Sequence, residues 1–457
     1  MSCPEPIENR QPRTNSTTIA LSLMTNRIHY AWIVALVTFG VLLVTAGVRA
    51  TPGVLMISLE GEFGWSRTAI SAAVAINIAL FGLIGPFAAS VMDRWGLRRV
   101  VLGAVALLMV SVALTTRMQT QWQFTLLWGV LVGTGTGVTS MVLAAIIASR
   151  WFDERRGLVL GILSAANATG QLVFLPVLAS LVAARGWRAA ALVVSGAAAV
   201  VFGIVYFFMR DRPEDLGLLP YGQNRALGNA SSVRAMAPVE ALRHAVRSRP
   251  FWILAGTFFV CGASTNGLIG THLIAACHDY GIAEVRSARL LAMMGIFDII
   301  GTTASGWLTD RYSPRHLLFS YYTLRGISLL FLPFTLHEAA GGLAWFAVFY
   351  GLDWIATVPP TVRLTNEAFG RENTGVIYGW IGASHQLGAS MAAFGAGAIR
   401  TALGDYQLAF WIAGVLCVAA GLSFLTIGRR SFVPPGWTGI HSSRFAAPVS
   451  VARSVRL

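Results

Sequence analysis

The chain has 457 residues, of which 55% are hydrophobic and only 12% are charged, and its net charge at pH 7 is +14. Soluble domains carry about 25% charged residues, so this composition excludes a soluble protein and predicts an integral membrane protein. All the positive charge comes from arginine, because the sequence has no lysine, and the arginines lie in short loops between apolar stretches. This distribution argues against a nucleic-acid partner and favours contact with anionic lipid headgroups.

Residues 1–29 form a polar N-terminal segment without the pattern of a signal peptide, and we expect a cytoplasmic tail there. The four cysteines, Cys3, Cys261, Cys277 and Cys417, show neither the spacing of metal ligands nor a disulfide framework. We therefore expect no metal and no other cofactor.

Twelve stretches follow that are long and apolar enough to cross a bilayer, for which a helix needs about 20 residues. They cover residues 30–57, 68–92, 100–117, 122–148, 158–184, 187–209, 251–277, 287–308, 317–336, 341–364, 376–400 and 407–428. The connections after the even-numbered stretches hold the arginine clusters, at residues 93–99, 150–156, 210–250, 310–316 and 363–372. The positive-inside rule then places these connections and both termini on the cytoplasmic side of the cell (inner) membrane.

One long connection divides the chain into two halves of six stretches each. We expect a cytoplasmic tail at 1–29, a bundle at 30–212, a cytoplasmic linker at 213–250, a second bundle at 251–428 and a cytoplasmic tail at 429–457. Within the linker, Pro238 to Ser248 have the pattern of a short amphipathic helix, with Arg243 and Arg247 on one face, that lies on the membrane surface.

The loop between the second and third stretches recurs 217 residues later. The two copies read Asp93-Arg94-Trp95-Gly96-Leu97-Arg98-Arg99 and Asp310-Arg311-Tyr312-Ser313-Pro314-Arg315-His316. Glycines keep nearly the same register beyond the loop, since Gly133 matches Gly351 and Gly170 matches Gly388 at an offset of 218. Small residues at matched positions let helices approach closely, so the pattern indicates a transporter built from two repeated six-helix halves.

These loops resemble the loop between helices 2 and 3 of the major facilitator superfamily, Gly-x-Leu-Ala-Asp-Arg-x-Gly-Arg-Arg. Gly306 keeps the first glycine of that motif in the second copy, whereas Ala89 replaces it in the first. The resemblance implies an all-α membrane fold of twelve transmembrane helices in two pseudo-symmetric six-helix bundles. We expect the motif residues to lock the two halves in an outward-open state; they are Asp93, Arg94, Gly96, Arg98, Gly306, Asp310 and Arg311.

Charged side chains inside membrane helices are costly, so each is a functional candidate. Asp298 and Asp353 lie near the middle of the eighth and tenth stretches, and Arg325 lies in the ninth. We expect these three residues to serve in proton coupling or gating, and Asp353 precedes a Pro-Pro pair at 359–360 that must interrupt its helix. In the family the ninth helix is an outer support, so the alternative is a structural ion pair of Arg325 with Asp298 or Asp353.

The repeat register pairs Arg49 with Asn266 and His385 with Asn167. These residues belong to the first, seventh, eleventh and fifth helices, which line the central cavity in the family. We expect the substrate-binding residues to be Arg49, Asn266, His272, His385, Gln386 and Asn167. The alternatives are that Arg49 reaches the outer interface or pairs with Glu60 or Glu62, and that the histidines are satisfied inside the bundle.

Phe63-Gly64-Trp65-Ser66-Arg67 resembles a segment of the monocarboxylate transporter and oxalate/formate antiporter branch, whose members bind carboxylates with membrane-embedded cations. Arg49 matches the basic residue that this branch carries on helix 1. The branch also has an Asp and an Arg four residues apart on helix 8. Asp298 matches the first of these, but Thr302 replaces the second.

Together these features predict a secondary transporter of a small organic anion, proton-coupled and monomeric, that works by alternating access. A drug or metabolite exporter or importer is the alternative, although residues 165–170 lack the Gly-Pro pair typical of antiporters. A membrane sensor or enzyme would need a soluble module or clustered catalytic groups, and no connection exceeds about 40 residues. We therefore expect no enzymatic activity, and the sequence has no phosphate-binding loop for ATP.

Overall fold

A computed structural model describes residues 29–223, 238–337 and 341–425. The predicted tails at 1–29 and 429–457 therefore lie outside the described residues, apart from His29. Within the described residues each of the twelve apolar stretches is mainly helical, and most of the helices extend by a few residues beyond the predicted ends; residues 426–428 of the last stretch lie outside the described part of the chain. Ten of the described helical segments are long and apolar enough to cross a membrane, and a shorter apolar helix covers Gln407–Ser423.

The N-terminal half contains the first six stretches. Its elements are α2 (Tyr30–Phe63), α3 (Arg67–Trp95), α4 (Leu97–Thr115), a fourth stretch built from α5 (Gln121–Phe124), η1 (Thr125–Val132), α6 (Gly133–Val138) and α7 (Met141–Trp151), then α8 (Arg156–Arg185) and α9 (Trp187–Phe208). Local signals explain several helix ends. Gly64 is left-handed and closes α2, and the Ser66 hydroxyl accepts a hydrogen bond from Ala69 N at the start of α3.

The C-terminal half repeats this pattern. After the short η2 (Pro213–Leu216) and α10 (Pro238–Ala245) come α11 (Arg249–Gly262), η3 (Ala263–Ile269), α12 (Gly270–Asp279), α13 (Glu284–Arg311), α14 (Pro314–His337), α15 (Gly341–Asp353), α16 (Val358–Phe369), α17 (Arg371–Leu403) and α18 (Gln407–Leu425). The amphipathic helix expected in the linker is α10, which ends at Ala245, three residues before the predicted end.

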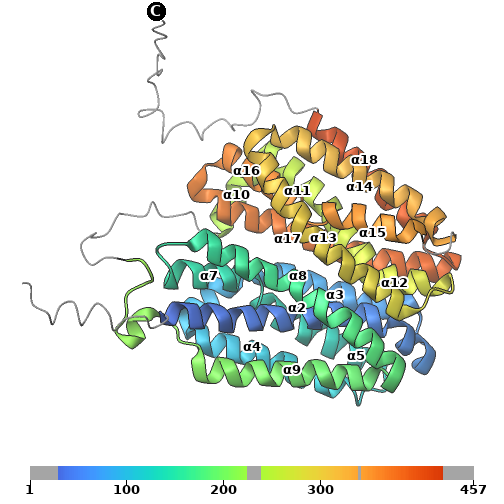
Figure 1. The fold of residues 1–457 in the computed structure, drawn as a ribbon, viewed down its shortest axis with the longest axis horizontal. Coiled ribbons are helices and arrows are strands. Elements are labelled where there is room, and N and C mark those ends of the chain that lie inside the picture. The colour runs from blue at the N-terminus through green and yellow to red at the C-terminus, as the bar shows by residue number, and fades with distance from the viewer. Residues whose placement is uncertain (1–28, 224–237, 338–340, 426–457) are drawn as a thin grey trace, which may run out of the picture.

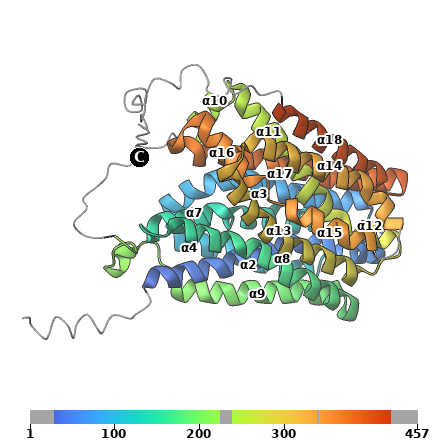
Figure 2. The same cartoon turned by 45° about the horizontal axis from the view of Figure 1, so that its top comes forward.

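The two halves lie side by side with their helices running in nearly the same direction. The N-terminal half holds α9 at its outer edge and the C-terminal half holds α18 at the opposite edge, in both views (Figures 1 and 2). The halves meet along α3 and α17, α8 and α13, and α2 and α12. The predicted all-α fold of two pseudo-symmetric six-helix bundles is therefore confirmed.

Glycines of the repeat explain why the halves pack alike. A Cβ atom on Gly133 would lie 2.8 Å from the Cα atom of Asn77 in α3. A Cβ atom on its repeat partner Gly351 would lie 2.8 Å from the Cα atom of Met294 in α13. Each glycine thus permits a close crossing of two helices at the same place in its half.

We call the end that carries residues 209–223 and α10 the linker end, and the opposite end the distal end. The seam between α3 and α17 is tight toward the distal end, where a Cβ atom on Gly397 would lie 2.3 Å from the Ser71 hydroxyl. At the linker end, Gly157 of α8 and Gly375 of α17 face open space. The described structure is therefore closed at its distal end.

Candidate functional site

A small cavity of about 50 Å³ lies between the two halves, midway along the helices. Its polar lining comes from both halves: Arg49, Asn77 and Gln171 from one side, Asn266 and Thr271 from the other. Trp354 and aliphatic side chains complete the wall. A cavity at the interface of the repeats, near the middle of the membrane, is where transporters of this architecture bind their substrates.

Arg49 is the charged residue of this cavity. Its guanidinium lies 3.8 Å from the centre of the Phe81 ring, but it makes no hydrogen bond or ion pair with any described residue. Glu60 and Glu62 are not its partners, because Glu60 pairs with Arg67 and Glu62 pairs with Arg188. The alternative of an ion pair between Arg49 and either glutamate is therefore excluded in this conformation.

The helices that carry the polar residues are irregular at the cavity. Pro52 interrupts the hydrogen-bond ladder of α2 one turn after Arg49, and it also lines the cavity. Asn266 lies in the π-helical segment η3, where its backbone oxygen accepts a hydrogen bond from Thr271 Oγ1 at 2.8 Å. Such π-helical segments occur frequently at functional sites.

Three of the predicted substrate-binding residues do not line this cavity. His272 is fully buried, and its ring nitrogens contact Tyr406 Oη at 3.1 Å and the Ala393 oxygen at 2.8 Å. His385 packs against Phe258 with ring centres 4.9 Å apart. Gln386 packs in the seam with α3, where its Oε1 atom is buried without a partner among the described residues.

The repeat register identifies the helix on which a side chain lies but not the face that it occupies, which is why these three residues can lie on cavity-lining helices without lining the cavity in this conformation. In this conformation the contacts of His272 are those of the alternative, a histidine satisfied inside the bundle. Asn167 lies in α8, but its side chain is outside the described part of the chain. Asn77 and Gln171, polar residues of α3 and α8, also line the cavity.

The tenth stretch is broken as the Pro-Pro pair predicts. Helix α15 ends at Asp353 and α16 begins at Val358. Asp298 Oδ1 accepts hydrogen bonds from the backbone N–H of Ile355, within the break, and from Thr302 Oγ1, both at 2.9 Å. Asp298 therefore supports the opened backbone, while Thr302 occupies the position where the resemblance expects an arginine.

Arg325 is buried beside this break and pairs with Asp353. Its Nε atom lies 2.6 Å from Asp353 Oδ2, and its Nη1 atom lies 2.8 Å from the Cys261 sulfur. A further nitrogen donates to the backbone oxygens of Asp353 and Trp354. Of the two partners expected for Arg325, the structure shows Asp353.

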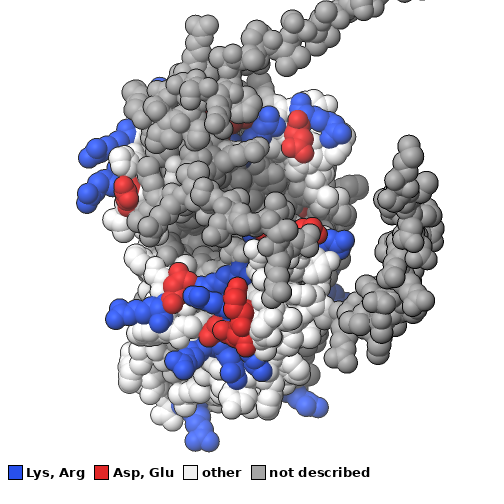
Figure 3. Space-filling model, turned by 90° about the vertical axis from the view of Figure 1, so that its left-hand side faces the viewer, with Lys and Arg blue, Asp and Glu red and all other residues white. Residues whose placement is uncertain are grey.

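The repeated loop motif lies at the linker end. Asp93 pairs with Arg150 of α7, and the backbone N–H of Arg98 donates to Asp211 Oδ1 at 2.6 Å. Gly96 has a φ of 89°, which favours glycine at this turn. All these pairs join elements of the N-terminal half. Figure 3 shows basic and acidic side chains intermingled on this end of the molecule.

The other residues of the motif make fewer contacts with neighbouring helices. Arg94, Asp310 and Arg311 are exposed, and the Arg311 guanidinium lies 3.9 Å from the centre of the Trp307 ring. Gly306 has open space where a Cβ atom would lie. The glycine shared with the family motif therefore makes no close helix contact in this conformation.

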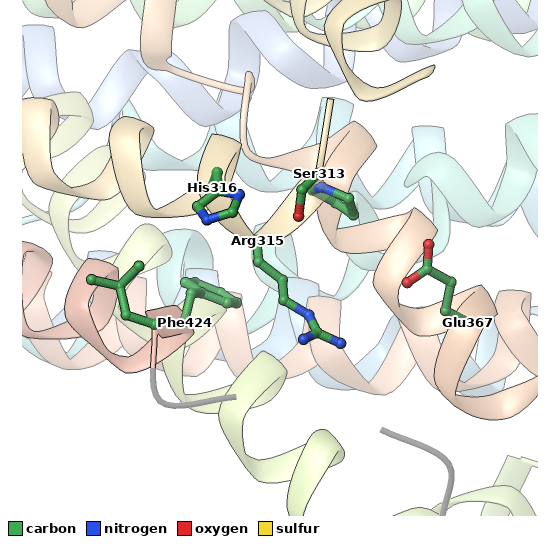
Figure 4. Close-up of a pocket in the computed structure, with 7 residues that line it drawn as sticks. Ser313, Arg315, His316, Glu367 and Phe424 are labelled. Carbon is green, nitrogen blue, oxygen red and sulfur yellow. The ribbon is translucent and has the colours of Figure 1, made fainter. Parts of the chain in front are cut away.

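A second pocket of about 470 Å³ lies at the linker end of the C-terminal half (Figure 4). Its lining includes Ser313, Arg315 and His316 around the start of α14, together with Glu367 and Phe424. It does not lie between the halves, and it adjoins Leu425, the last described residue. The central cavity is therefore the better candidate for substrate binding.

A charged cluster of Glu60, Arg67, Asp279 and Arg400 lies at the distal end, and none of these residues was expected to have a functional role. Arg67 contacts Glu60 of its own half and Asp279 of the other half. In the sequence, Arg67 is recognisable only as a charged residue at the start of an apolar helix. It belongs to the segment Phe63–Arg67, which was interpreted only as a resemblance to the monocarboxylate transporter branch. The other members, Asp279 and Arg400, lie at the ends of apolar stretches, where charges are ordinary.

Comparisons with known proteins agree with this geometry. A model of the family described as the Major Facilitator Superfamily matches residues 37–393, and again residues 278–454. The chain is 27% identical over 401 residues to the MFS-type transporter YcxA of Bacillus subtilis, covering 86% of this chain and 93% of that protein. It is also 27% identical over 404 residues to monocarboxylate transporter 13 of Rattus norvegicus, covering 87% and 89% of the two chains.

A solved structure resembles the fold. The crystal structure of a D-xylose-proton symporter superposes with a TM-score of 0.68 at 16% identity, covering 89% of this chain and 98% of that one. Because the identity is low, this likeness supports the arrangement of the helices and nothing about the substrate.

Proposed function

Because the chain belongs to the major facilitator superfamily and is a membrane transporter, we propose that its substrate is a small organic anion that binds through a carboxylate. The transport is secondary active, driven by protons and carried out by alternating access of the central cavity to the two sides of the membrane. The substrate-binding residues in this proposal are Arg49, Asn266, Asn77 and Gln171.

The unpaired Arg49 supports this proposal most directly. A guanidinium stays charged at every accessible pH, and an unpaired charge inside a membrane protein is costly. Arg49 lines the central cavity and has only the Phe81 ring against it among the described residues. A substrate carboxylate would satisfy the guanidinium through two parallel hydrogen bonds. The relatives that are named monocarboxylate transporters support the same substrate class.

Proton coupling is assigned to the carboxylates at the broken helix. Asp298 and Asp353 are both buried in the C-terminal half, and Asp353 Oδ1 has no hydrogen-bond partner among the described residues. The break between α15 and α16 places Trp354 in the cavity wall directly after Asp353. Protonation of either carboxylate would therefore alter the conformation of a segment that lines the substrate cavity. Arg325 holds that segment in place through its backbone oxygens.

The arginine clusters at the linker end support an orientation with this end, the linker and both termini in the cytoplasm. The distal end then faces outward, and the closed distal end is the outer side. We assign the protein to the cell membrane as a monomer, with the bilayer as its other partner.

A second candidate is the import or export of a less polar metabolite or drug-like compound. It is favoured by the apolar part of the cavity wall, where Val74, Ile78, Leu175 and Leu291 surround the polar groups. A neutral compound of this kind would leave Arg49 without a partner.

Thermal unfolding of the purified protein separates the two candidates. The probes are acetate, lactate, pyruvate and oxalate, each compared with its uncharged amide at the same ionic strength. Stabilisation by a carboxylate and not by its amide, lost in Arg49→Ala, is the expected result. Equal stabilisation by acid and amide, or stabilisation that survives in Arg49→Ala, would contradict anion recognition.

A further inference from the structure

At the distal end, one ion pair joins the two halves. Arg67, at the start of α3, donates from Nη1 to Asp279 Oδ2 at 2.8 Å and from Nη2 to Asp279 Oδ1 at 2.7 Å. Asp279 ends α12 in the C-terminal half. The Arg67 side chain is only 4% exposed, so this two-point pair is shielded from water and geometrically specific.

Each member of the pair has a second charged partner in its own half. Arg67 Nε lies 2.9 Å from Glu60 Oε2, near the end of α2. Asp279 accepts from Arg400 of α17, with Nε at 2.6 Å and Nη2 at 3.2 Å. The cluster therefore contains two positive and two negative groups, arranged in the order Glu60, Arg67, Asp279 and Arg400, and its boundary between the halves falls in the middle.

Uncharged contacts surround the cluster on the same seam. Arg67 Nη1 donates to Tyr406 Oη at 3.2 Å, and Tyr406 Oη in turn contacts His272 Nδ1 at 3.1 Å. Thr68 Oγ1 donates to Thr401 Oγ1 across the seam at 2.8 Å. His272 thus contacts the charged cluster through Tyr406, whereas it is absent from the central cavity.

We propose that Glu60, Arg67, Asp279 and Arg400 form the distal gate of the transporter, and that the gate divides into two neutral ion pairs when it opens. Of the three ion pairs in the cluster, separation of the halves would break only Arg67–Asp279, together with the uncharged hydrogen bonds across the seam. Glu60–Arg67 would remain on the N-terminal half and Asp279–Arg400 on the C-terminal half. Each charged group would keep one partner of opposite charge. The gate could therefore open without the large cost of leaving a buried charge unpaired.

The arrangement has a consequence that a merely structural ion cluster lacks. The central pair exists only when the gate is closed, so Asp279→Asn removes closed-state stabilisation and shifts the protein toward the distal-open state. The flanking residues Glu60 and Arg400 matter most when the gate is open. Glu60 is then the sole charged partner of Arg67, and Arg400 is the sole charged partner of Asp279. Glu60→Gln and Arg400→Gln therefore shift the protein in the opposite direction, toward the distal-closed state.

Labelling of an introduced cysteine measures the shift. Ser71 is fully buried and packs against Gly397 in the distal part of the seam, outside the central cavity, so Ser71→Cys reacts with a maleimide when the distal side opens. In purified protein we expect Asp279→Asn to raise the labelling rate about fivefold, the factor for about 1 kcal/mol, and Glu60→Gln and Arg400→Gln to lower it. The parent chain without Ser71→Cys sets the background, which covers any reaction at Cys3, while Cys261, Cys277 and Cys417 are buried.

Arg188→Gln is the matched control, because its ion pair with Glu62 also lies at the distal end but within the N-terminal half. It should leave the labelling rate unchanged. A shift of all three cluster variants in one direction, or an equal shift in Arg188→Gln, would overturn the proposal.

A disulfide provides an independent measurement. Thr68→Cys and Thr401→Cys should form a disulfide on mild oxidation, more slowly when combined with Asp279→Asn but not when combined with Glu60→Gln. Failure of the disulfide to form in the otherwise unchanged protein would overturn the assignment of a closed distal end. Neither measurement uses a substrate or depends on membrane orientation, so their failure is distinguishable from failure of the proposed carboxylate transport.

Discussion

Arg325 and Asp353 form a buried ion pair next to the broken tenth helix, with Arg325 Nε 2.6 Å from Asp353 Oδ2. The arginine side chain is fully buried and that of the aspartate is 10% exposed. The same guanidinium also donates to backbone oxygens in the break. The pair therefore connects the outer helix α14 to the segment that carries Trp354 into the cavity wall.

Removal of one member of this pair should be strongly destabilising, because it leaves the other charge buried without a partner. We expect Arg325→Met to lower the free energy of unfolding by about 3–5 kcal/mol. The double variant Arg325→Met/Asp353→Leu should recover much of the loss. Thermal unfolding in detergent provides the comparison, and equal losses in the single and double variants would show that the pair is not coupled.

Arg49→Ala should abolish carboxylate binding while the protein still inserts and folds. Loss of one member of a buried charged contact costs about 2 kcal/mol or more, which is about 30-fold or more in affinity. Arg49→Lys should also bind weakly, because an ammonium group cannot form the planar two-point contact. Arg117→Ala, an exposed arginine in a connection, is the control. Normal affinity in Arg49→Ala would remove the main support for anion transport.

Asp298→Asn should separate proton coupling from transport. The amide oxygen of asparagine can accept the hydrogen bonds from Ile355 N and Thr302 Oγ1, but the side chain no longer carries a titratable proton. We expect accumulation driven by a pH gradient to be lost while substrate exchange at equal pH continues in proteoliposomes. Thr302→Val, which keeps the carboxylate, is the control and should retain accumulation. Gradient-driven uptake in Asp298→Asn would assign the coupling elsewhere.

Asp93→Asn should affect the conformational balance more than substrate affinity, because its partner Arg150 lies at the linker end of α7, far along the helices from the cavity. We expect a changed maximal transport rate with little change in carboxylate affinity. Asp153→Asn serves as the control, since Asp153 forms an exposed pair with Arg156 at the same end. A large loss of binding with a normal transport rate would contradict a conformational role.

The proposed orientation predicts which introduced cysteines react in intact cells. Gln223→Cys, in the exposed end of the described linker segment, should react with a membrane-impermeant maleimide only after permeabilisation. Gln121→Cys, exposed at the start of α5 near the distal end, should react without it. The reverse pattern would invert the topology and make the closed distal end cytoplasmic.

The sequence alone predicted the helices and their grouping well. Long apolar stretches leave little choice in a bilayer, where every backbone polar group must be satisfied within a helix. The glycine register also predicted where helices cross closely, as at Gly133 and Gly351. The break after Asp353 followed from the Pro-Pro pair, because proline cannot complete the hydrogen-bond ladder of a helix.

What the sequence determined by itself is therefore the membrane-spanning fold, its two-fold repeat and a short set of costly buried charges. Only the tertiary structure decided which charges meet and which side chains face the cavity. His272 is on a cavity-lining helix yet bonds to Tyr406 and Ala393, and Arg67 meets Asp279 across 212 positions of sequence. Both outcomes depend on the rotation of each helix and the docking of the two halves, and these are set by side-chain packing over the whole seam rather than by any local pattern.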